Sequence, residues 1–181
     1  MKNLVNFLKG SSRRMNFITR FNTRVKTYCE PVSAHSFYVT VYVYIIGNIL
    51  KKNGYPIDVD CAVKRALFHD LEECMAGDIL TPFKVLFEKE YDNLCSTSMD
   101  TILHDLDEDI RVDIKSHWKG AKIGFEGTLV NFCDDLAGYI YCDEQIKTGN
   151  TYFHDIRDDY FSRLTAAGEN NKIFKQIVEA L

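Results

Sequence analysis

Apolar residues recur at helical spacing along nearly the whole chain, and no convincing pair of alternating, strand-like segments stands out. The segment at residues 34–50 is rich in β-branched and aromatic side chains, which strands also favour. Its length favours a buried helix, because strands usually span about 5–6 residues. We therefore expect an all-α protein in which one long helix begins at an N-cap on Ser33 and ends near Lys51.

Capping and turn residues divide the rest of the chain into further helices. Asp58 or Asp60 would cap a helix that Gly77 ends, and Thr81-Pro82 would begin the next one. A loop is expected over residues 13–29. The expected helices, besides the long apolar one, cover about residues 2–9, 59–75, 81–96, 99–118 and 123–147, with two short ones in 152–181 that separate near residue 168.

Length, composition and charge narrow the class of protein. A chain of 181 residues with 46 % hydrophobic residues can bury a real core, and neither a repeat nor a low-complexity linker divides it. We expect one domain over residues 1–181, with the motifs in about 13–145 and the C-terminal helices in about 152–181. The net charge of −4 argues against a nucleic-acid polymer as main partner but permits a small anionic ligand.

Location and redox state follow from the same composition. The first residues lack the apolar run of a secretory signal, and residues 39–50 are too short to span a bilayer, so we expect a cytoplasmic protein with no membrane partner. The six cysteines form no C-x-x-C pair. This favours free thiols, several of them in the core, over a zinc ribbon or a redox motif.

The segment ALFHDLEECMAGDILTP, residues 66–82, carries the most informative polar residues. His69 and Asp70 are adjacent near the end of an apolar helix, and together they suit a divalent transition metal better than calcium. Adjacent helical residues point about 100° apart, so both reach one ion only if it lies in a groove between helices. Further ligands must come from other helices.

Two residues elsewhere complete a candidate metal site. His35 lies in the first turn of the long apolar helix, and Asp134 lies between apolar neighbours in LVNFCDDLAGYI. An unpaired carboxylate beside the core is costly, and a bound cation removes that cost. Two His and two Asp form a neutral cage for a dication. Each residue also has a plainer explanation: a capping pair, a structural histidine, or a solvated acidic face that includes Asp135.

At this point the sequence resembles the HD-domain metal-dependent phosphohydrolases, and specifically the bacterial 5′-deoxynucleotidase branch. Four segments match in the family's order: Arg20-Phe21, V-S-x-H-S at residues 32–36, H-D-x-x-E-x-x-x-G-D-x-x-T-P at residues 69–82, and C-D-x-L at residues 133–136. The third segment is long and specific, whereas the others gain weight in combination. The resemblance covers about residues 13–145. It implies a single HD-type helical bundle with a metal site between helices.

The resemblance also implies roles for matching residues. His35, His69, Asp70 and Asp134 would bind one divalent ion, which is Co²⁺, Mn²⁺, Fe²⁺, Ni²⁺ or Zn²⁺. Two matching acids would be catalytic: Glu73 as acid/base or water-positioning group, and Asp78 near the attacking water and the sugar. Glu72 beside Glu73 fits a surface position better, and Asp78 has a plainer alternative as an N-cap. The substrate-binding residues would be Arg20, Phe21, Asp78, Thr81 and Pro82.

One departure from the family pattern concerns the sugar. The family has tryptophan after the phosphate-binding arginine, and its ring helps to exclude a ribose 2′-hydroxyl. Phe21 is smaller and has no indole N–H, so deoxyribose selectivity stays open. The arginine itself suits phosphate because its planar fork donates two hydrogen bonds, although a plain exposed arginine in a basic loop is the alternative.

The expected function is removal of the 5′-phosphate from (deoxy)nucleoside monophosphates by a metal-bound water. One alternative is a deoxynucleoside triphosphate triphosphohydrolase on the same fold, because the basic run in residues 13–26 would suit a longer phosphate chain. Another is a non-catalytic nucleotide-binding regulator. The resemblance also suggests a homodimer, while the base, the metal and the pathway stay undetermined.

Overall fold

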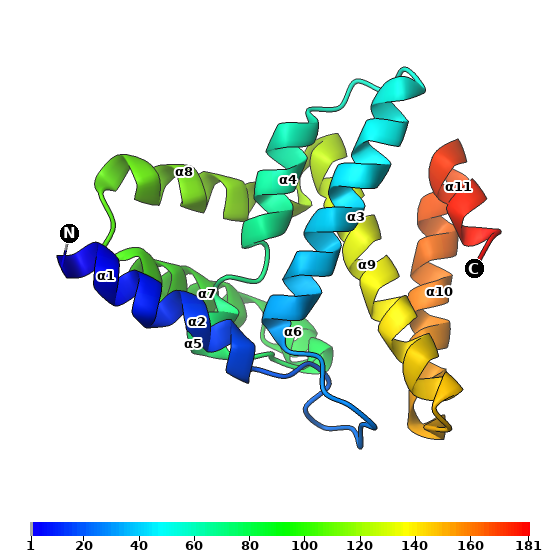
Figure 1. Cartoon of the computed structure of the whole chain (residues 1–181), viewed down its shortest axis with the longest axis horizontal. Helices are drawn as coiled ribbons and strands as arrows, with labels where there is room; N and C mark the ends of the chain where they lie inside the picture. Colours follow the sequence, from blue (N-terminus) through cyan, green and yellow to red (C-terminus); the bar gives the residue numbers. More distant parts are fainter. Residues whose placement is uncertain (1) are drawn as a thin grey trace.

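The structure is a computed structural model that describes residues 2–181, and it is helical throughout, with a single isolated bridge, Thr19–Pro31, as its β-structure in that range. The elements, in chain order, are α1 Lys2–Lys9, α2 Ser11–Arg14, η1 Met15–Phe17, α3 Val32–Lys52, α4 Val59–Phe68, α5 Glu73–Ala76, α6 Thr81–Leu86, α7 Glu88–Leu103, α8 Glu108–Lys119, η2 Gly120–Lys122, α9 Gly124–Lys147, η3 Thr151–Phe153, α10 His154–Glu169 and α11 Lys172–Val178 (Figure 1). The expected all-α class is confirmed.

The main core lies between α3, α4 and α9, with α10 and α11 covering the far side of α9 (Figure 1). Val39, Val43 and Leu50 of α3 are fully buried there, facing Leu129 and Cys133 of α9. α3 is long and apolar enough, by length and composition alone, to cross a membrane. One face of α3 packs against α4 and α9, whereas Phe37, Tyr44 and Ile45 of the same helix are exposed.

Two smaller clusters adjoin this core. One joins η1, α5, α7 and α8 through Met15, Cys74, Met99 and Ile114. The other is aromatic and joins the end of α9 to η3 and α10. Since the first turn of α3 and the end of α4 lie where these clusters meet the main core, polar residues there are held by packing on several sides.

The expected helix over residues 59–75 is wrong in its second half. α4 ends at Phe68, residues 69–72 form turns, and α5 is a separate short helix. The Nδ1 of His69 donates to the carbonyl of Ala66 at 2.7 Å. In a continuing helix that carbonyl would accept from the backbone N–H of Asp70. His69 is thus the C-cap of α4, and the polar residues within 69–73 follow directly after the end of the helix.

Other boundaries also differ from expectation. α3 begins at Val32 after an N-cap at Pro31, not at Ser33. The expected 81–96 helix is interrupted at Phe87, whose ψ of 45° is not helical, and α7 then runs on to Leu103. Between the two caps considered for α4, Asp58 is the one used, since its carboxylate accepts from the Cys61 N–H at 2.9 Å.

All six cysteines are free thiols, and Cys74, Cys95, Cys133 and Cys142 are buried, as expected for core-filling residues. The expected helix over residues 123–147 is confirmed as α9, as are the two tail helices α10 and α11.

The loop between η1 and α3 is tied to the body of the protein. A short antiparallel ribbon holds its two ends, through hydrogen bonds from Val32 N–H to the Ile18 carbonyl at 2.8 Å and from Arg20 N–H to the Glu30 carbonyl at 3.0 Å. Farther out, the buried Gln145 of α9 accepts from the Thr27 N–H at 2.8 Å. The loop therefore presents Arg20 and Glu30 side by side at the start of α3.

Candidate active site

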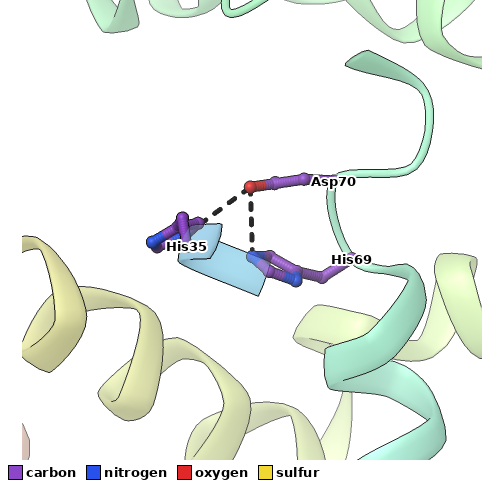
Figure 2. A group of neighbouring side chains, drawn as sticks. All are labelled: His35, His69 and Asp70. Carbon is purple, nitrogen blue, oxygen red and sulfur yellow. Dashed lines mark ion pairs between the residues drawn. The ribbon is translucent and has the colours of Figure 1, made fainter. Parts of the chain in front are cut away.

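His35, His69 and Asp70 form a group whose ligand atoms all lie within 4.8 Å of one another (Figure 2). The Oδ2 of Asp70 is 3.1 Å from Nε2 of His69 and 3.7 Å from Nε2 of His35. His35 comes from α3, whereas His69 and Asp70 come from the turn after α4, so the group joins two helices as expected. Figure 2 shows both imidazole rings directed toward the one carboxylate oxygen.

The donor atoms of this group fit a metal ion. The Nε2 atoms of His35 and His69 are buried, and neither has a hydrogen-bond partner within residues 2–181. The carboxylates of Asp70 and Asp134 lie close to these Nε2 atoms but form no hydrogen bond with them. This arrangement suits ligands of one shared ion better than hydrogen-bonded pairs. Because Nδ1 of His69 donates to a backbone carbonyl, Nε2 is the nitrogen that offers a lone pair to a metal once the ring is neutral.

Asp134 adds a carboxylate from α9. Its Oδ1 lies 3.0 Å from Nε2 of His35 and 3.8 Å from Nη2 of Arg20. Burial disfavours its ionised form, but the contacts with His35, His69 and Arg20 hold its pKa well below the usual range. The neighbouring Asp135 turns to Arg163 at 3.3 Å instead, which leaves Asp134 as the one of these two aspartates that contacts His35.

The two histidines are electrostatically different. Burial and the Arg20 guanidinium lower the pKa of His35 to about 4, so this imidazole is neutral at pH 7. Burial also lowers the pKa of His69, but Asp70 outweighs burial and raises that pKa to about 9. In the absence of a metal ion, the protonated His69 therefore partly compensates the negative charge of the neighbouring carboxylates.

Glu73 and Glu72 are both buried beside this group, at 5 % and 6 % exposure. Burial, followed by repulsion from Asp70, raises the pKa of Glu73 to about 9, so this carboxyl holds its proton at neutral pH. Its nearest cation is Lys84, with Nζ 3.9 Å from Oε1. The expectation that Glu72 is a surface residue is wrong, because the turns of residues 69–72 carry it inward, where it accepts from Trp118 Nε1 at 2.8 Å.

Asp78 does not cap a helix. Its Oδ2 accepts from the backbone N–H of Phe21 at 3.1 Å, and its carbonyl accepts from Asn22 Nδ2 at 3.0 Å. Phe21 has a φ of 54°, a backbone conformation that costs energy in a non-glycine residue. Its ring stacks on Tyr141 at 5.4 Å. The strained residue thus anchors Asp78 with its backbone and joins the aromatic cluster with its side chain.

A cavity of about 610 Å³ opens over these groups. Its lining includes Arg20, Phe21, His69, Asp70, Glu73, Asp78, Thr81 and Asp134 among the sequence-predicted residues. His35 is fully buried beneath it, and Pro82 is exposed on α6 outside its lining. A cavity of this size accommodates a small phosphorylated ligand.

Sequence reasoning missed several residues of the site. Glu30 is buried and lies 3.5 Å from Nη1 of Arg20, and the hydroxyl of Tyr160 accepts from Nη2 at 3.3 Å. Trp118 and Lys84 line the cavity. None sits in a segment with a recognisable pattern, since tertiary packing alone brings them in, although Glu30 precedes the V-S-x-H-S segment by two residues.

This all-helical fold, with a His-Asp pair after one helix and further His and Asp residues from flanking helices, defines an HD-domain phosphohydrolase. More specifically, the chain belongs to the family described as 5′-deoxynucleotidase YfbR-like, whose model matches residues 6–179. It is 30 % identical over 166 residues to a 5′-deoxynucleotidase of Shewanella oneidensis, covering 87 % of this chain and 82 % of that one. A Vibrio vulnificus 5′-deoxynucleotidase is 28 % identical over 145 residues, covering 77 % and 75 %.

Solved structures support the fold. An HD-domain phosphohydrolase of Listeria innocua superposes with a TM-score of 0.85 at 18 % identity, covering 97 % of this chain and 86 % of that one. The HD phosphohydrolase of cyanophage S-2L, bound to dA and one catalytic Zn²⁺ ion, gives 0.61 at 18 % identity, covering 94 % and 96 %.

Proposed function

We propose that the protein is a metal-dependent phosphohydrolase that removes the 5′-phosphate of (deoxy)nucleoside monophosphates. The observation that carries this proposal is the pair of buried imidazole Nε2 atoms, without hydrogen-bond partners among the described residues and directed at Asp70 beneath an open cavity. Membership of the 5′-deoxynucleotidase family and the names of its relatives supply the substrate class. The phage neighbour with Zn²⁺ and dA is consistent with both metal and ligand.

We propose that His35, His69, Asp70 and Asp134 hold one divalent ion, which is Co²⁺, Mn²⁺, Fe²⁺, Ni²⁺ or Zn²⁺. When bound, such an ion supplies Lewis-acid activation of water and of the phosphoryl group. The neutral His35 and the two ionised carboxylates match the protonation states that a ligand set requires, and His69 would release its proton when the ion binds.

The remaining groups would bind substrate and move protons. Arg20 lines the cavity and would hold the phosphate oxygens, with Thr81 in the wall beside them. Water attacks phosphorus, the bond from phosphorus to the 5′-oxygen breaks, and Glu73, protonated at neutral pH, would donate its proton to the leaving oxygen. Asp78, fixed by the Phe21 N–H, would orient the sugar or the water.

Product analysis tests this function. Metal-stripped protein, with and without added Co²⁺ or Mn²⁺, is incubated with deoxy- and ribonucleoside mono- and triphosphates. We expect metal-dependent release of phosphate and nucleoside from monophosphates. His69→Ala should abolish both metal retention and turnover, whereas His104→Ala, at an exposed histidine outside the cavity lining, should preserve them. A His69→Ala protein that keeps both would refute the proposal.

The same experiment separates the rival functions. Tripolyphosphate released from a triphosphate would indicate a triphosphohydrolase. Tight nucleotide binding without turnover in metal-loaded protein would indicate a regulator.

We further propose that the chain works as one domain, as a homodimer, in the cytoplasm, and on small nucleotides without a nucleic-acid polymer. Light scattering across protein concentrations tests the dimer.

A further inference from the structure

Two histidines would bind the ion through Nε2. In only one of them does a backbone carbonyl hold the other ring nitrogen, Nδ1. His69 donates from Nδ1 to the Ala66 carbonyl, which leaves Nε2 free for a ligand. His35 has no such backbone acceptor among the described residues. Its Nδ1 instead faces Arg20 and Glu30, with Nη1 of Arg20 at 2.5 Å and Oε2 of Glu30 at 4.0 Å.

The contact with Arg20 defines the tautomer of His35 in this structure. A guanidinium donates and cannot accept, so Nδ1 is the acceptor of this short hydrogen bond. A neutral imidazole then carries its proton on Nε2, the atom directed at Asp70 and Asp134. Metal ligation through Nε2 requires the opposite tautomer, with the proton on Nδ1 and an acceptor beside it.

Glu30 is placed to be that acceptor. It is the one carboxylate within 4.0 Å of Nδ1 in residues 2–181, and a shift of about 1 Å would bring it to hydrogen-bond distance. It is 8 % exposed, and its backbone carbonyl accepts from the Arg20 N–H at 3.0 Å. The ribbon that presents Arg20 to His35 therefore presents Glu30 to the same ring.

We propose that Glu30 is a positioning residue for His35: it accepts the Nδ1–H when Nε2 binds the metal ion, and it takes the place that Arg20 holds in this structure. The inference rests on the proposed function, because it concerns the same metal site. Arg20 then loses its bond to the ring and keeps its cavity-side partners, Tyr160 at 3.3 Å and Asp134 at 3.8 Å. Metal loading thus frees a donor of Arg20 for phosphate.

The test measures zinc binding and the tautomer of His35, with no need for turnover. Nitrogen NMR of ¹⁵N-histidine-labelled protein should show the His35 proton on Nε2 without metal and on Nδ1 with zinc. Competition with a chromogenic chelator should show zinc affinity about 10–100-fold lower in Glu30→Gln than in the wild type. The matched control is Glu144→Gln, which removes a carboxylate that accepts from Tyr28 in the same loop. It should leave zinc affinity unchanged.

Each alternative result has a defined meaning. Wild-type zinc affinity in Glu30→Gln, or a zinc-loaded His35 with no proton on Nδ1, would overturn the inference. The NMR arm uses the wild type, so the inference stays testable if Glu30→Gln fails to fold. Zinc binding that depends on Glu30, without any turnover of nucleotides, would support this inference while refuting the proposed reaction.

Discussion

At the residue scale, the raised pKa of Glu73, the proposed proton donor, makes the stability of the fold depend on pH. Its carboxyl has a usual pKa of 4.5, which burial and Asp70 raise to about 9 in the folded chain. Between these values the folded state binds more protons than the unfolded state, so stability falls as pH rises, by at most about 1.4 kcal/mol per pH unit for this group. Below pH 4.5 the group contributes no pH dependence.

We therefore expect Glu73→Gln to flatten the decline of stability of the metal-free protein between about pH 5 and 9. Urea denaturation at several pH values measures it, with Glu88→Gln, at an exposed glutamate of α7, as control. The same Glu73→Gln substitution should lower turnover by about 10²–10⁴-fold, since it removes the proton donor. Parallel pH profiles of wild type and Glu73→Gln would contradict the raised pKa.

Phe21 determines a second residue-scale prediction, on sugar selectivity. Its ring is held against Tyr141, Phe153 and Tyr160, and it is smaller than the family's tryptophan. A purely apolar contact discriminates by only about 10–200-fold. We expect kcat/KM for a deoxynucleotide to exceed that for its ribonucleotide by no more than about 200-fold. A ratio of several hundred would mean that a polar group, such as Asp78, rejects the 2′-hydroxyl.

At the element scale, the N-cap and the end of α4 determine where His69 and Asp70 lie. Sequence patterns located the helix and offered two caps, and only the structure distinguishes them. Asp58→Ala should destabilise the protein by about 1 kcal/mol, or about 2–4 °C in Tm, because Asp58 accepts from the Cys61 N–H. Asp60→Ala, within the first turn, should cost less. Equal losses in thermal denaturation would refute this assignment.

Gly138 controls how closely α9 and α10 approach. A Cβ there would clash with the ring of Tyr160, whose hydroxyl accepts from Arg20. Gly138→Ala should therefore cost about 1–3 kcal/mol and raise KM by displacing that hydroxyl from Arg20. Adding Tyr160→Leu should recover stability without recovering KM. Calorimetry and steady-state kinetics measure both, and a Gly138→Ala protein with wild-type values would contradict the close packing.

At this scale, the sequence predicts the long helices well but not their exact ends or the residues that tertiary packing brings to the site. Long periodic segments such as 123–147 were placed closely, because helical periodicity depends on many residues. The end of α4 was missed because one side-chain bond, from His69 to Ala66, overrides the local helical pattern. Likewise Trp118 and Tyr160 reach the site through packing between distant segments, which no spacing along the chain encodes.

At the scale of the whole molecule, the site lies where three segments of the main core meet. His35 belongs to α3, His69 and Asp70 follow α4, Asp134 belongs to α9, and these segments share the main core. Buried carboxylates and lone imidazoles concentrated there oppose folding unless a cation compensates them. A bound ion should therefore stabilise the whole fold.

Metal loading should raise Tm of the entire cooperative transition. An ion at 100 times its Kd contributes about 2.7 kcal/mol, which corresponds to about 5–10 °C for a protein of this size. Calorimetric scans with increasing Co²⁺ or Zn²⁺ measure the shift, and His69→Ala should remove it while His104→Ala, at an exposed histidine, should keep it. A shift that survives in His69→Ala would place the ion elsewhere. Because α3, the turn after α4, and α9 would each supply ligands, the metal-loaded protein should unfold in one transition, since loss of any one of them would release the ion.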